Sequence, residues 1–547
     1  MKKYSFIFSY FKKRNMIVLI SMMLLASILS LCPPYMISYI LDNGVVRASQ
    51  GTIISGGIFL ICIYVGIFFV HYFISQTLTR ASSYFIADLK NDLFMRILKL
   101  PMEFFDNKQT GYVLERMKET DALNVFFSPV FLKFVTSVFS CIGAFALILS
   151  IRWELALVLL VFLPAIYYFT NYSSLQIKKA SKALFESNAQ TSGKVQENIS
   201  GISAVKEMKM EQQCASEISK QLKTVADRSV QRGKMMNLAS EGILGISNIS
   251  SVILVVLSGL FIVNGKMSLG NYWAVSQYAM LVFAPVQLLS SISIMVQPGI
   301  AALSRIGELL KLKTEEEVSG DKKTGRIEDI VCSDVSFAYT ERPVIRNFNM
   351  RAHRNTKIVL SGKNGSGKTT VAKLLLGFYK NYSGSIRING IELRDISLED
   401  LRSRIGIVAQ NIFLFSGSLL DNIRYISPDL KEQEITAALK KAGLTISEFE
   451  NGLHFMVNEN GKNLSGGQRQ KIALARMIVK NPDVMIFDEA TSNLDVTASN
   501  LLKQSVHSIF ADKICIIITH DPEMASIVDK ILKFFDERHK PSLWIQY

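Results

Sequence analysis

Residues 362–369 are Gly-Lys-Asn-Gly-Ser-Gly-Lys-Thr, which matches the pattern G-x-x-x-x-G-K-[ST] of phosphate-binding loops. The residues before the loop, Lys357–Leu360, predict a short strand, and those after it predict a helix that runs to Leu376. A strand, a glycine-rich loop and a helix in this order are the context that the motif requires. The second half of the chain is therefore predicted to be an α/β P-loop NTPase domain.

The loop carries the groups needed to hold a nucleoside triphosphate. Glycines let backbone N–H groups close around phosphate oxygens, and the following helix directs its positive end at them. Lys368 is expected to reach the β and γ phosphates, and the Thr369 hydroxyl is expected to bind Mg²⁺. The predicted phosphate-binding residues are Gly362, Asn364, Gly365, Ser366, Gly367, Lys368, Thr369 and Thr370.

A second stretch, Val484–Glu489, is an apolar run that ends in two carboxylates. Such a run predicts a buried central strand whose carboxyl end faces the nucleotide. Asp488 would hold Mg²⁺, directly or through water, and Glu489 would orient and deprotonate the attacking water. Taken alone, the Asp-Glu pair would more simply be a solvated turn, so its assignment depends on the loop at 362–369.

The composition indicates a membrane protein. Hydrophobic residues make up 49% of the 547 residues and charged residues 20%, and the mean hydropathy is +0.25. These values exclude a disordered chain and a purely soluble multidomain enzyme. Six stretches without Asp, Glu, Lys or Arg are long enough to cross a membrane as helices: Asn15–Leu41, Thr52–Thr79, Phe134–Ile151, Leu155–Ile177, Gly242–Gly265 and Met267–Ser304.

Lys and Arg alternate strongly between the segments that connect these spans. They are abundant before the first span, between the second and third, and between the fourth and fifth, whereas each remaining turn carries a single one. The positive-inside rule then places both termini and both long loops in the cytoplasm, and the ATPase domain with them. The expected location is the cytoplasmic (inner) membrane of a bacterium. The same residues account for much of the net charge of +15 without a nucleic-acid partner.

The two long basic segments have helical spacing, so the membrane helices are expected to continue as cytoplasmic stalks. Each contains a turn-like interruption, Asp106–Gly111 in the first and Asn198–Ile202 in the second. On periodicity alone, these segments could equally be ordinary solvated surface. We predict a transmembrane domain at 1–312, a linker at 313–327 and an ATPase domain at 328–547.

Between the loop and the carboxylate strand lies Leu464-Ser465-Gly466-Gly467-Gln468, a glycine-pair turn that opens a helix. Together with Gln410, Asp488-Glu489 and Thr519-His520, this order of motifs resembles the nucleotide-binding domain of ATP-binding cassette (ABC) transporters. Six spans followed by one such domain resemble the exporter half-transporters of that family. The resemblance implies a membrane all-α six-helix domain followed by an α/β P-loop NTPase domain of the ABC ATPase type, with ATP and Mg²⁺ as cofactors.

The resemblance also implies roles for residues outside the loop. Tyr339 would stack on adenine, and Gln410 would sense Mg²⁺ and the attacking water. Ser465–Gln468 would bind ATP held by an opposite subunit, while His520 would contact the γ phosphate from the same subunit. Asp495 would communicate between the two sites. The predicted catalytic residues are Glu489, His520 and Gln410, and the predicted metal ligands are Thr369, Gln410 and Asp488.

The membrane half resembles the same branch at its two interruptions. Phe104-Phe105-Asp106, Thr110-Gly111, Arg116 and Asp121 follow the pattern of the first coupling helix, and Glu197–Glu211 resembles the second. Two departures are evident: Asn458-Glu459-Asn460-Gly461 stands where exporters usually have Gly-Glu-Arg-Gly, and the subdomain after His520 looks shortened.

Because one chain has one phosphate loop and one signature, a homodimer is expected. The resemblance implies an ATP-driven exporter that works by alternating access. An ATP-gated channel or regulatory subunit is a distant alternative, because such proteins tend to lose the catalytic carboxylate or a signature residue, and both are present here.

The cargo must be predicted from polar residues within the spans. Each of them singly could make an interhelical hydrogen bond, but together they favour a bulky amphipathic cargo over a small ion. A small antimicrobial or modified peptide is predicted, with lipid flippase or multidrug exporter as the alternative. The candidates are His71, Tyr167, Tyr168, Asn171, Glu241, Asn248, Asn271, Gln277, Tyr278, Gln287 and Gln297.

Overall fold

A computed structural model describes residues 13–106, 108, 110–363, 365–489, 504–519 and 528–534. The chain divides into two compact units: residues 1–97 with 111–311, and residues 98–110 with 312–547. The short segment Leu98–Thr110 therefore belongs with the second unit, although it lies among the membrane helices in sequence.

The first unit consists of long helices. Five helical segments in the described residues have the length and apolar composition needed to cross a membrane. The sixth predicted span falls in α10, a helix of 41 residues in which the side chains at 290, 291, 293 and 294 lie outside the described set. The elements are α2 (Lys13–Tyr39), the π-helix η2 (Ile40–Val45), α3 (Gln50–Leu98), α5 (Thr110–Glu119), the 3₁₀-helix η3 (Thr120–Phe127), α6 (Pro129–Ile151), α7 (Trp153–Ser200), α8 (Ile202–Glu207), α9 (Glu211–Val263) and α10 (Leu269–Leu309).

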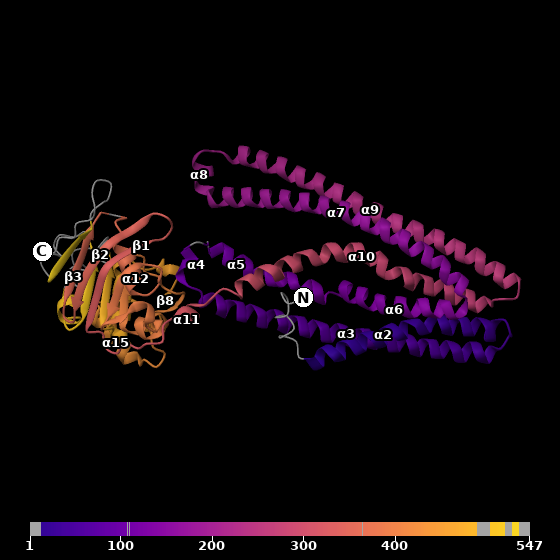
Figure 1. Ribbon diagram of the computed structural model, residues 1–547, viewed down its shortest axis with the longest axis horizontal. Coiled ribbons are helices and arrows are strands. Elements are labelled where there is room, and N and C mark those ends of the chain that lie inside the picture. The colour runs from indigo at the N-terminus through magenta and orange to yellow at the C-terminus, as the bar shows by residue number, and fades with distance from the viewer. Residues whose placement is uncertain are drawn as a thin grey trace. The chain divides into compact units, whose positions relative to one another are not determined.

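The predicted continuation of the apolar stretches as long helices is confirmed, because α3, α7 and α9 are continuous helices of 49, 48 and 53 residues. Figure 1 shows α7 and α9 running side by side, with α8 at the end where they join. The interruption predicted at Asn198–Ile202 falls where α7 ends and the short helix α8 begins. Leu155, Ile166, Ile243 and Leu254 on these two helices are buried in one apolar cluster.

The prediction that Tyr278 lines a central cavity is wrong. Tyr278 is 1% exposed and donates a hydrogen bond of 2.9 Å from its hydroxyl to the carbonyl of Leu31, so it joins α10 to α2 within the bundle. Asn271 similarly accepts a bond of 3.5 Å from Ser38. These two contacts are the interhelical bonds that were the simpler interpretation of polar residues in spans.

The second unit contains an α/β fold with two main sheets in its described part. A parallel sheet has the strand order β11-β3-β10-β9-β6, and an antiparallel sheet has the order β2-β1-β4-β5. The strands are β1 (Asp329–Ala338), β2 (Pro343–His353), β3 (Lys357–Gly362), β4 (Ser383–Ile388), β5 (Ile391–Glu392), β6 (Ile405–Val408), β7 (Gly417–Ser418), β8 (Met456–Val457), β9 (Val484–Asp488), β10 (Ile514–Ile518) and β11 (Lys530–Phe534). The helices are α4 (Met102–Asp106), α11 (Glu315–Val318), α12 (Lys368–Leu375), α13 (Leu398–Arg404), α14 (Leu419–Arg424), α15 (Glu432–Lys441) and α16 (Gly466–Lys480), and the short 3₁₀ turns are η4 (Leu393–Asp395), η5 (Ile446–Glu448), η6 (Gly452–His454) and η7 (Glu459–Gly461).

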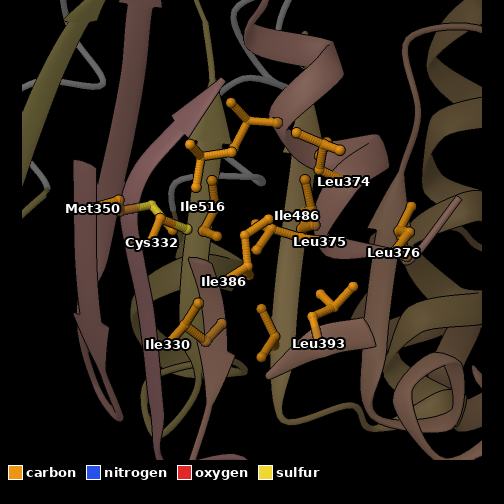
Figure 2. Close-up of a cluster of buried hydrophobic side chains, with 14 of the residues drawn as sticks. Ile330, Cys332, Met350, Leu374, Leu375, Leu376, Ile386, Leu393, Ile486 and Ile516 are labelled. Carbon is orange, nitrogen blue, oxygen red and sulfur yellow. The ribbon is translucent and has the colours of Figure 1, made fainter. Parts of the chain in front are cut away.

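The parallel sheet is buried on both faces, as a run of consecutive apolar residues predicts. Ile486 and Ile516 belong to the cluster that β1 completes with Ile330 and Cys332, β2 with Met350 and β4 with Ile386, as Figure 2 shows. The alternate residues, Met485 and Phe487 on β9 and Cys515 and Ile517 on β10, belong to the cluster formed with α14, α15 and α16. The period of two along each strand thus divides one sheet between two cores.

The segment predicted as a linker is held against the ATPase domain. Arg402 forms hydrogen bonds of 2.6 and 3.0 Å with the two carboxylate oxygens of Glu315 on α11. Asp400 accepts bonds of 2.8 and 3.0 Å from the backbone N–H and hydroxyl of Thr324. Residues 313–327 are therefore an ordered part of the second unit.

Candidate functional site

The phosphate loop connects the end of β3 to the start of α12. Gly362 and Gly367 have φ of 154° and 97°, in the region that favours glycine. A Cβ at Gly362 would lie 2.4 Å from the carbonyl oxygen of Phe534, and one at Gly367 would lie 2.9 Å from that of Val344. Both conformation and space therefore require glycine at these two positions.

Lys368 folds back over the loop that precedes it. Its Nζ donates to the carbonyls of Gly362 at 2.6 Å and Lys363 at 2.9 Å, and its side chain is buried. Burial lowers the pKa of Lys368, while the charges of Glu489 and Asp488 act in the opposite direction. Among the described residues, the ammonium group donates to these two loop carbonyls, and an anionic phosphate would be a stronger partner than either.

The two predicted metal ligands Thr369 and Asp488 lie in contact. The Thr369 hydroxyl donates to Oδ1 of Asp488 at 3.0 Å, and Asp488 is 4% exposed at the end of β9. Burial raises the pKa of Asp488, and the bond from Thr369 partly offsets this effect. A hydroxyl and a carboxylate oxygen are ligands that suit Mg²⁺.

Gln410 and Glu489 follow neighbouring parallel strands, β6 and β9, so both lie at the carboxyl edge of the sheet. Nε2 of Gln410 donates to Oε2 of Glu489. Glu489 has a φ of 48°, and its backbone N–H donates to the carbonyl of Ile518 at 2.9 Å. This pairing was not evident from the sequence, because it depends on the strand order.

Tyr339 lies beside the loop helix. Its hydroxyl donates to Thr370 at 3.2 Å, and the ammonium of Lys373 lies 5.6 Å from its ring centre. The ring packs edge-on against Phe337 and Tyr379, with centroids 4.9 and 5.2 Å apart, and is 40% exposed. An aromatic surface held in this way can stack on a base. Tyr379 is the residue of this group that the sequence did not reveal.

The signature residues form the N-terminus of α16. Ser465 and Gln468 make a reciprocal capping box, in which Oγ of Ser465 accepts from the Gln468 N–H at 3.2 Å and Oε1 of Gln468 accepts from the Ser465 N–H at 2.9 Å. A Cβ at Gly466 or Gly467 would have no heavy atom within 4 Å. Since α16 packs on β6, which β9 and β10 separate from β3, the signature is not beside the loop of its own chain.

The segment Asn458–Gly461, which differs from the usual Gly-Glu-Arg-Gly of exporters, forms a tight turn. Asn460 has a φ of 58° and donates its N–H to the carbonyl of Leu414 at 3.1 Å, and Glu459 is exposed. Three predicted residues, Asn364, Asp495 and His520, lie outside the described residues, as does the segment that follows Phe534.

The described residues fit a bound nucleotide. The Ser366 hydroxyl is buried without a hydrogen-bond partner in the described part of the chain, so the loop holds a polar group that a phosphate oxygen could satisfy. A Cβ at Gly365 would also meet no atom within 4 Å, which leaves room for a ligand at the loop backbone.

Comparisons with known proteins find similar proteins for both halves of the chain. The family model described as ABC transporter transmembrane region matches residues 16–286, and the model described as ABC transporter matches residues 345–492. An uncharacterized ABC transporter ATP-binding protein, YwjA of Bacillus subtilis, is 29% identical over 95% of this chain and 92% of its own. The ATP-dependent lipid A-core flippase of Francisella novicida is 27% identical over 82% of this chain and 79% of its own.

Among solved structures, a bacterial Atm1-family ABC exporter with ATP bound matches with a TM-score of 0.81 and 20% identity, over 95% of this chain and 93% of that one. This likeness shows the fold. Together with the multiple apolar helices, it describes a multi-pass membrane protein with an exporter-type fold. The chain therefore belongs to the ABC transporters, as a transmembrane region fused to an ATPase domain that couples ATP hydrolysis to transport.

Proposed function

We propose that this protein is an ATP-driven exporter of the bacterial inner membrane that works by alternating access. The distribution of Lys and Arg supports cytoplasmic termini and a cytoplasmic ATPase domain. The domain division proposed is 1–312, 313–327 and 328–547. Its partners are a second copy of the chain, the lipid bilayer and the cargo, and no nucleic acid.

The dimer is supported by the position of the signature. Gly466 and Gly467 have open space over them at the start of α16, which packs on β6, while the phosphate loop follows β3, on the far side of β9 and β10. A helix N-terminus with small residues suits an anionic ligand. We propose that Ser465–Gln468 and Asp495 of one copy complete the nucleotide site of the other.

Each site residue has a separate proposed task. Thr369, Asp488 and Gln410 would hold Mg²⁺, which neutralises charge on the phosphates when bound. Lys368 and the loop backbone bind and orient the triphosphate. Glu489 accepts the proton of the attacking water, and its bond from Gln410 holds the carboxylate in place. His520 is proposed to contact the γ phosphate.

The cargo best supported is an amphipathic lipid, which was the alternative to a peptide. One observation carries this choice: a cavity of about 420 Å³ inside the first unit, lined by apolar side chains from α2, α3, η3, α6 and α10. Thr77 and Ala81 on its wall flank Arg80, the first cation after the second apolar stretch, so the cavity lies near the membrane surface. Relatives are named as lipid A-core flippases.

The peptide prediction remains a second candidate because of side chains on α7 and α9. Tyr167, Tyr168 and Asn171 on α7 and Asn248 on α9 are exposed in the single chain. These phenols and amides could bind peptide groups in a cavity between two copies. Tyr278 no longer supports it, since its hydroxyl is bonded within the bundle.

Cargo-stimulated ATPase activity in reconstituted vesicles tests the proposal. Ala81→Phe should fill the cavity and abolish stimulation by lipids or hydrophobic dyes, whereas Ala87→Phe, on the exposed face of the same helix, should leave it unchanged. Stimulation only by peptides would replace the lipid proposal with the peptide one. Absence of sustained ATP hydrolysis under all conditions would favour a channel or regulatory subunit.

A further inference from the structure

Two segments of the paired helices α7 and α9 form a cluster of positive charge. Residues 178–182 of α7 and 228–234 of α9 contain six Lys or Arg residues and no Asp or Glu. The segment on α7 begins directly after Ile177, where the charge-free stretch of that helix ends, so the cluster is expected at a membrane surface. This basic cluster consists of Lys178, Lys179, Lys182, Arg228, Arg232 and Lys234.

The two segments lie at the same level of the helix pair. Figure 1 shows α7 and α9 side by side, joined at one end by α8, so they run antiparallel. A Cβ at Gly242 on α9 would lie 2.3 Å from the ring of Phe169 on α7, so these two positions are opposite each other. Ten residues after Phe169 is Lys179, and ten residues before Gly242 is Arg232, which places these two cations opposite each other as well.

A second contact, farther along the helix pair, agrees with this alignment. The pKa of Lys194 on α7 is raised by its hydrogen bond to Glu197, by the charge of Glu197 and by the charge of Glu217 on α9. Lys194 lies 25 residues after Phe169, and Glu217 lies 25 residues before Gly242. The basic cluster lies between these two contacts, so the same alignment holds across it.

Most cations of the basic cluster have no carboxylate partner in the described part of the chain. Lys182 lies 3.8 Å from Glu186, in an exposed ion pair. For the other five, no Asp or Glu among the described residues lies within ion-pair distance. Positive charges held close together on a helix pair repel one another, so an anionic partner would stabilise this surface.

Two buried polar groups without hydrogen-bond partners lie at the level of the cluster. Ser181 is 5% exposed and belongs to the buried face of α7, and its hydroxyl has no partner in the described part of the chain. Nε of Arg232 is also buried and lacks a partner among the same residues. Buried polar groups are normally hydrogen-bonded, and both of these can donate, so an acceptor oxygen of a ligand suits them.

The surface on the membrane side of the cluster is apolar. Tyr172 and Leu175 on α7 and Leu238 on α9 are exposed, and tyrosine is typical of the membrane interface. The described lining of the apolar cavity proposed for cargo comes from α2, α3, η3, α6 and α10. Acyl chains that contact this surface would therefore lie outside that cavity.

We propose that the basic cluster and Ser181 bind the phosphate of an anionic phospholipid in the cytoplasmic leaflet, at a site separate from the cargo cavity. Arg232 and Ser181 donate to phosphate oxygens between the helices, and Lys178 and Lys179 add positive charge around them. The bound lipid holds the α7–α9 pair at the membrane surface and is not transported. The inference uses the proposed orientation of the chain but not the proposed cargo.

Lipid binding to the purified full-length protein tests this site. Native mass spectrometry in a neutral detergent counts bound phosphatidylglycerol, and phosphatidylcholine with the same acyl chains is the lipid without net charge. The test variant combines Lys179→Gln with Arg232→Gln. The control combines Lys220→Gln with Lys223→Gln, which removes the same charge from exposed positions of α9 farther from its charge-free stretch.

The parent protein should bind the first phosphatidylglycerol roughly tenfold more tightly than phosphatidylcholine, as expected for hydrogen bonds to a charged group. The test variant should lose this preference, and the control should keep it. Ser181→Ala should weaken phosphatidylglycerol binding roughly two- to fivefold, as expected for loss of one hydrogen bond. It should not lower the unfolding temperature, because the hydroxyl has no partner in the described part of the lipid-free protein.

Equal preference for phosphatidylglycerol in the parent and the test variant, or an equal loss in the control, would overturn the inference. Displacement of the lipid by inorganic phosphate at equal concentration would also overturn it, because free phosphate would then be the ligand. If the test variant does not fold, Ser181→Ala decides the matter in the same way.

Ala81→Phe, which fills the cargo cavity, should leave phosphatidylglycerol binding unchanged. Loss of binding in that variant would place the lipid in the cavity and overturn the separate site. Failure of lipids to stimulate ATP hydrolysis would instead refute the proposed cargo, because binding at the basic cluster is measured without ATP.

Discussion

The hydroxyl of Thr369 donates a hydrogen bond of 3.0 Å to the carboxylate of Asp488, although 119 positions separate the two residues in the chain. Thr369 lies in the first turn of α12 and Asp488 ends β9, so the bond joins the end of the phosphate loop to the parallel sheet. In the proposed function, both oxygens would be ligands for the Mg²⁺ that accompanies the nucleotide.

Asp488→Asn should remove the Mg²⁺ dependence of ATP binding and lower hydrolysis, because an amide oxygen is a weaker ligand for the ion than a carboxylate. ATP titrations with and without Mg²⁺ check this result. Asp429→Asn, at an exposed position, is the control. Unchanged Mg²⁺ dependence in Asp488→Asn would remove this residue from the metal site.

The same variant should stabilise the nucleotide-free protein at neutral pH. Since burial raises the pKa of Asp488 above its ordinary value of 3.8, the folded state binds more protons than the unfolded state between the two pKa values. The contribution of Asp488 to stability therefore falls as pH rises through this window. The unfolding temperature of Asp488→Asn should exceed that of the parent at pH 7, and the difference should shrink in acid.

Glu489→Gln should leave ATP binding largely intact and reduce turnover by about 10²- to 10⁴-fold, because the amide keeps the shape of the side chain but cannot act as a base. Gln410 could still bond the remaining carbonyl oxygen. ATP hydrolysis and binding by purified protein are the measurements, with exposed Glu450→Gln as the control. Hydrolysis at the normal rate would show that another group is the base.

The motifs predicted most of the site because their contacts are local or follow from strand order. The loop from Gly362 to Thr369 is contiguous, and the carboxyl ends of parallel strands meet at one edge, which places Asp488 near it. A hydrogen bond from the Tyr379 hydroxyl to Asp106, the last residue of α4, spans 273 positions and belongs to no motif, so only the folded structure reveals it.

The membrane helices, too, could be predicted only in part from the sequence. Absence of charge located the apolar stretches, but it could not locate helix ends, because a helix continues into water when its sequence has no stop signal. Thus α7 runs from Trp153 to Ser200, beyond the predicted stretch Leu155–Ile177. The burial of Tyr278 could not be predicted, because it depends on which face of α10 meets α2.

Lys368→Ala should weaken ATP binding roughly 10- to 100-fold, because it removes the ammonium group that is proposed to contact the β and γ phosphates. Lys440→Ala, at an exposed position on α15, should have no effect. A binding titration with the purified protein decides the matter, and equal affinities for parent and Lys368→Ala would refute the assignment.

Asp400→Asn should destabilise the ATPase domain by about 1–2 kcal/mol at pH 7. Burial alone would raise the pKa of Asp400, but bonds from Thr324 and Arg404 lower it overall. Its stabilising effect is therefore present above the ordinary pKa of 3.8 and is lost as pH falls through the lower, folded-state value. Thermal unfolding between pH 7 and pH 3 should show the difference from the parent shrinking, and a constant difference would contradict this account.

Mixed dimers should reveal whether each nucleotide site uses two chains. Lys368→Ala disables the loop of one chain, and Gly467→Glu places a carboxylate over the open N-terminus of α16 in the other. Each variant alone should be inactive. A mixed dimer would keep one intact site, formed by the loop of the Gly467→Glu chain and the signature of the Lys368→Ala chain.

Random pairing of equal amounts should therefore restore about a quarter of the parent ATPase activity, since half of the dimers would each have one working site of two. Coexpression of differently tagged chains allows this measurement. The control pairs Lys368→Ala with a chain carrying both substitutions, which leaves no intact site in any dimer and should give no activity. If each loop instead acted with the signature of its own chain, neither pairing would contain an intact site and both would be inactive. Equal inactivity of the two pairings would therefore show that the two copies do not share their nucleotide sites.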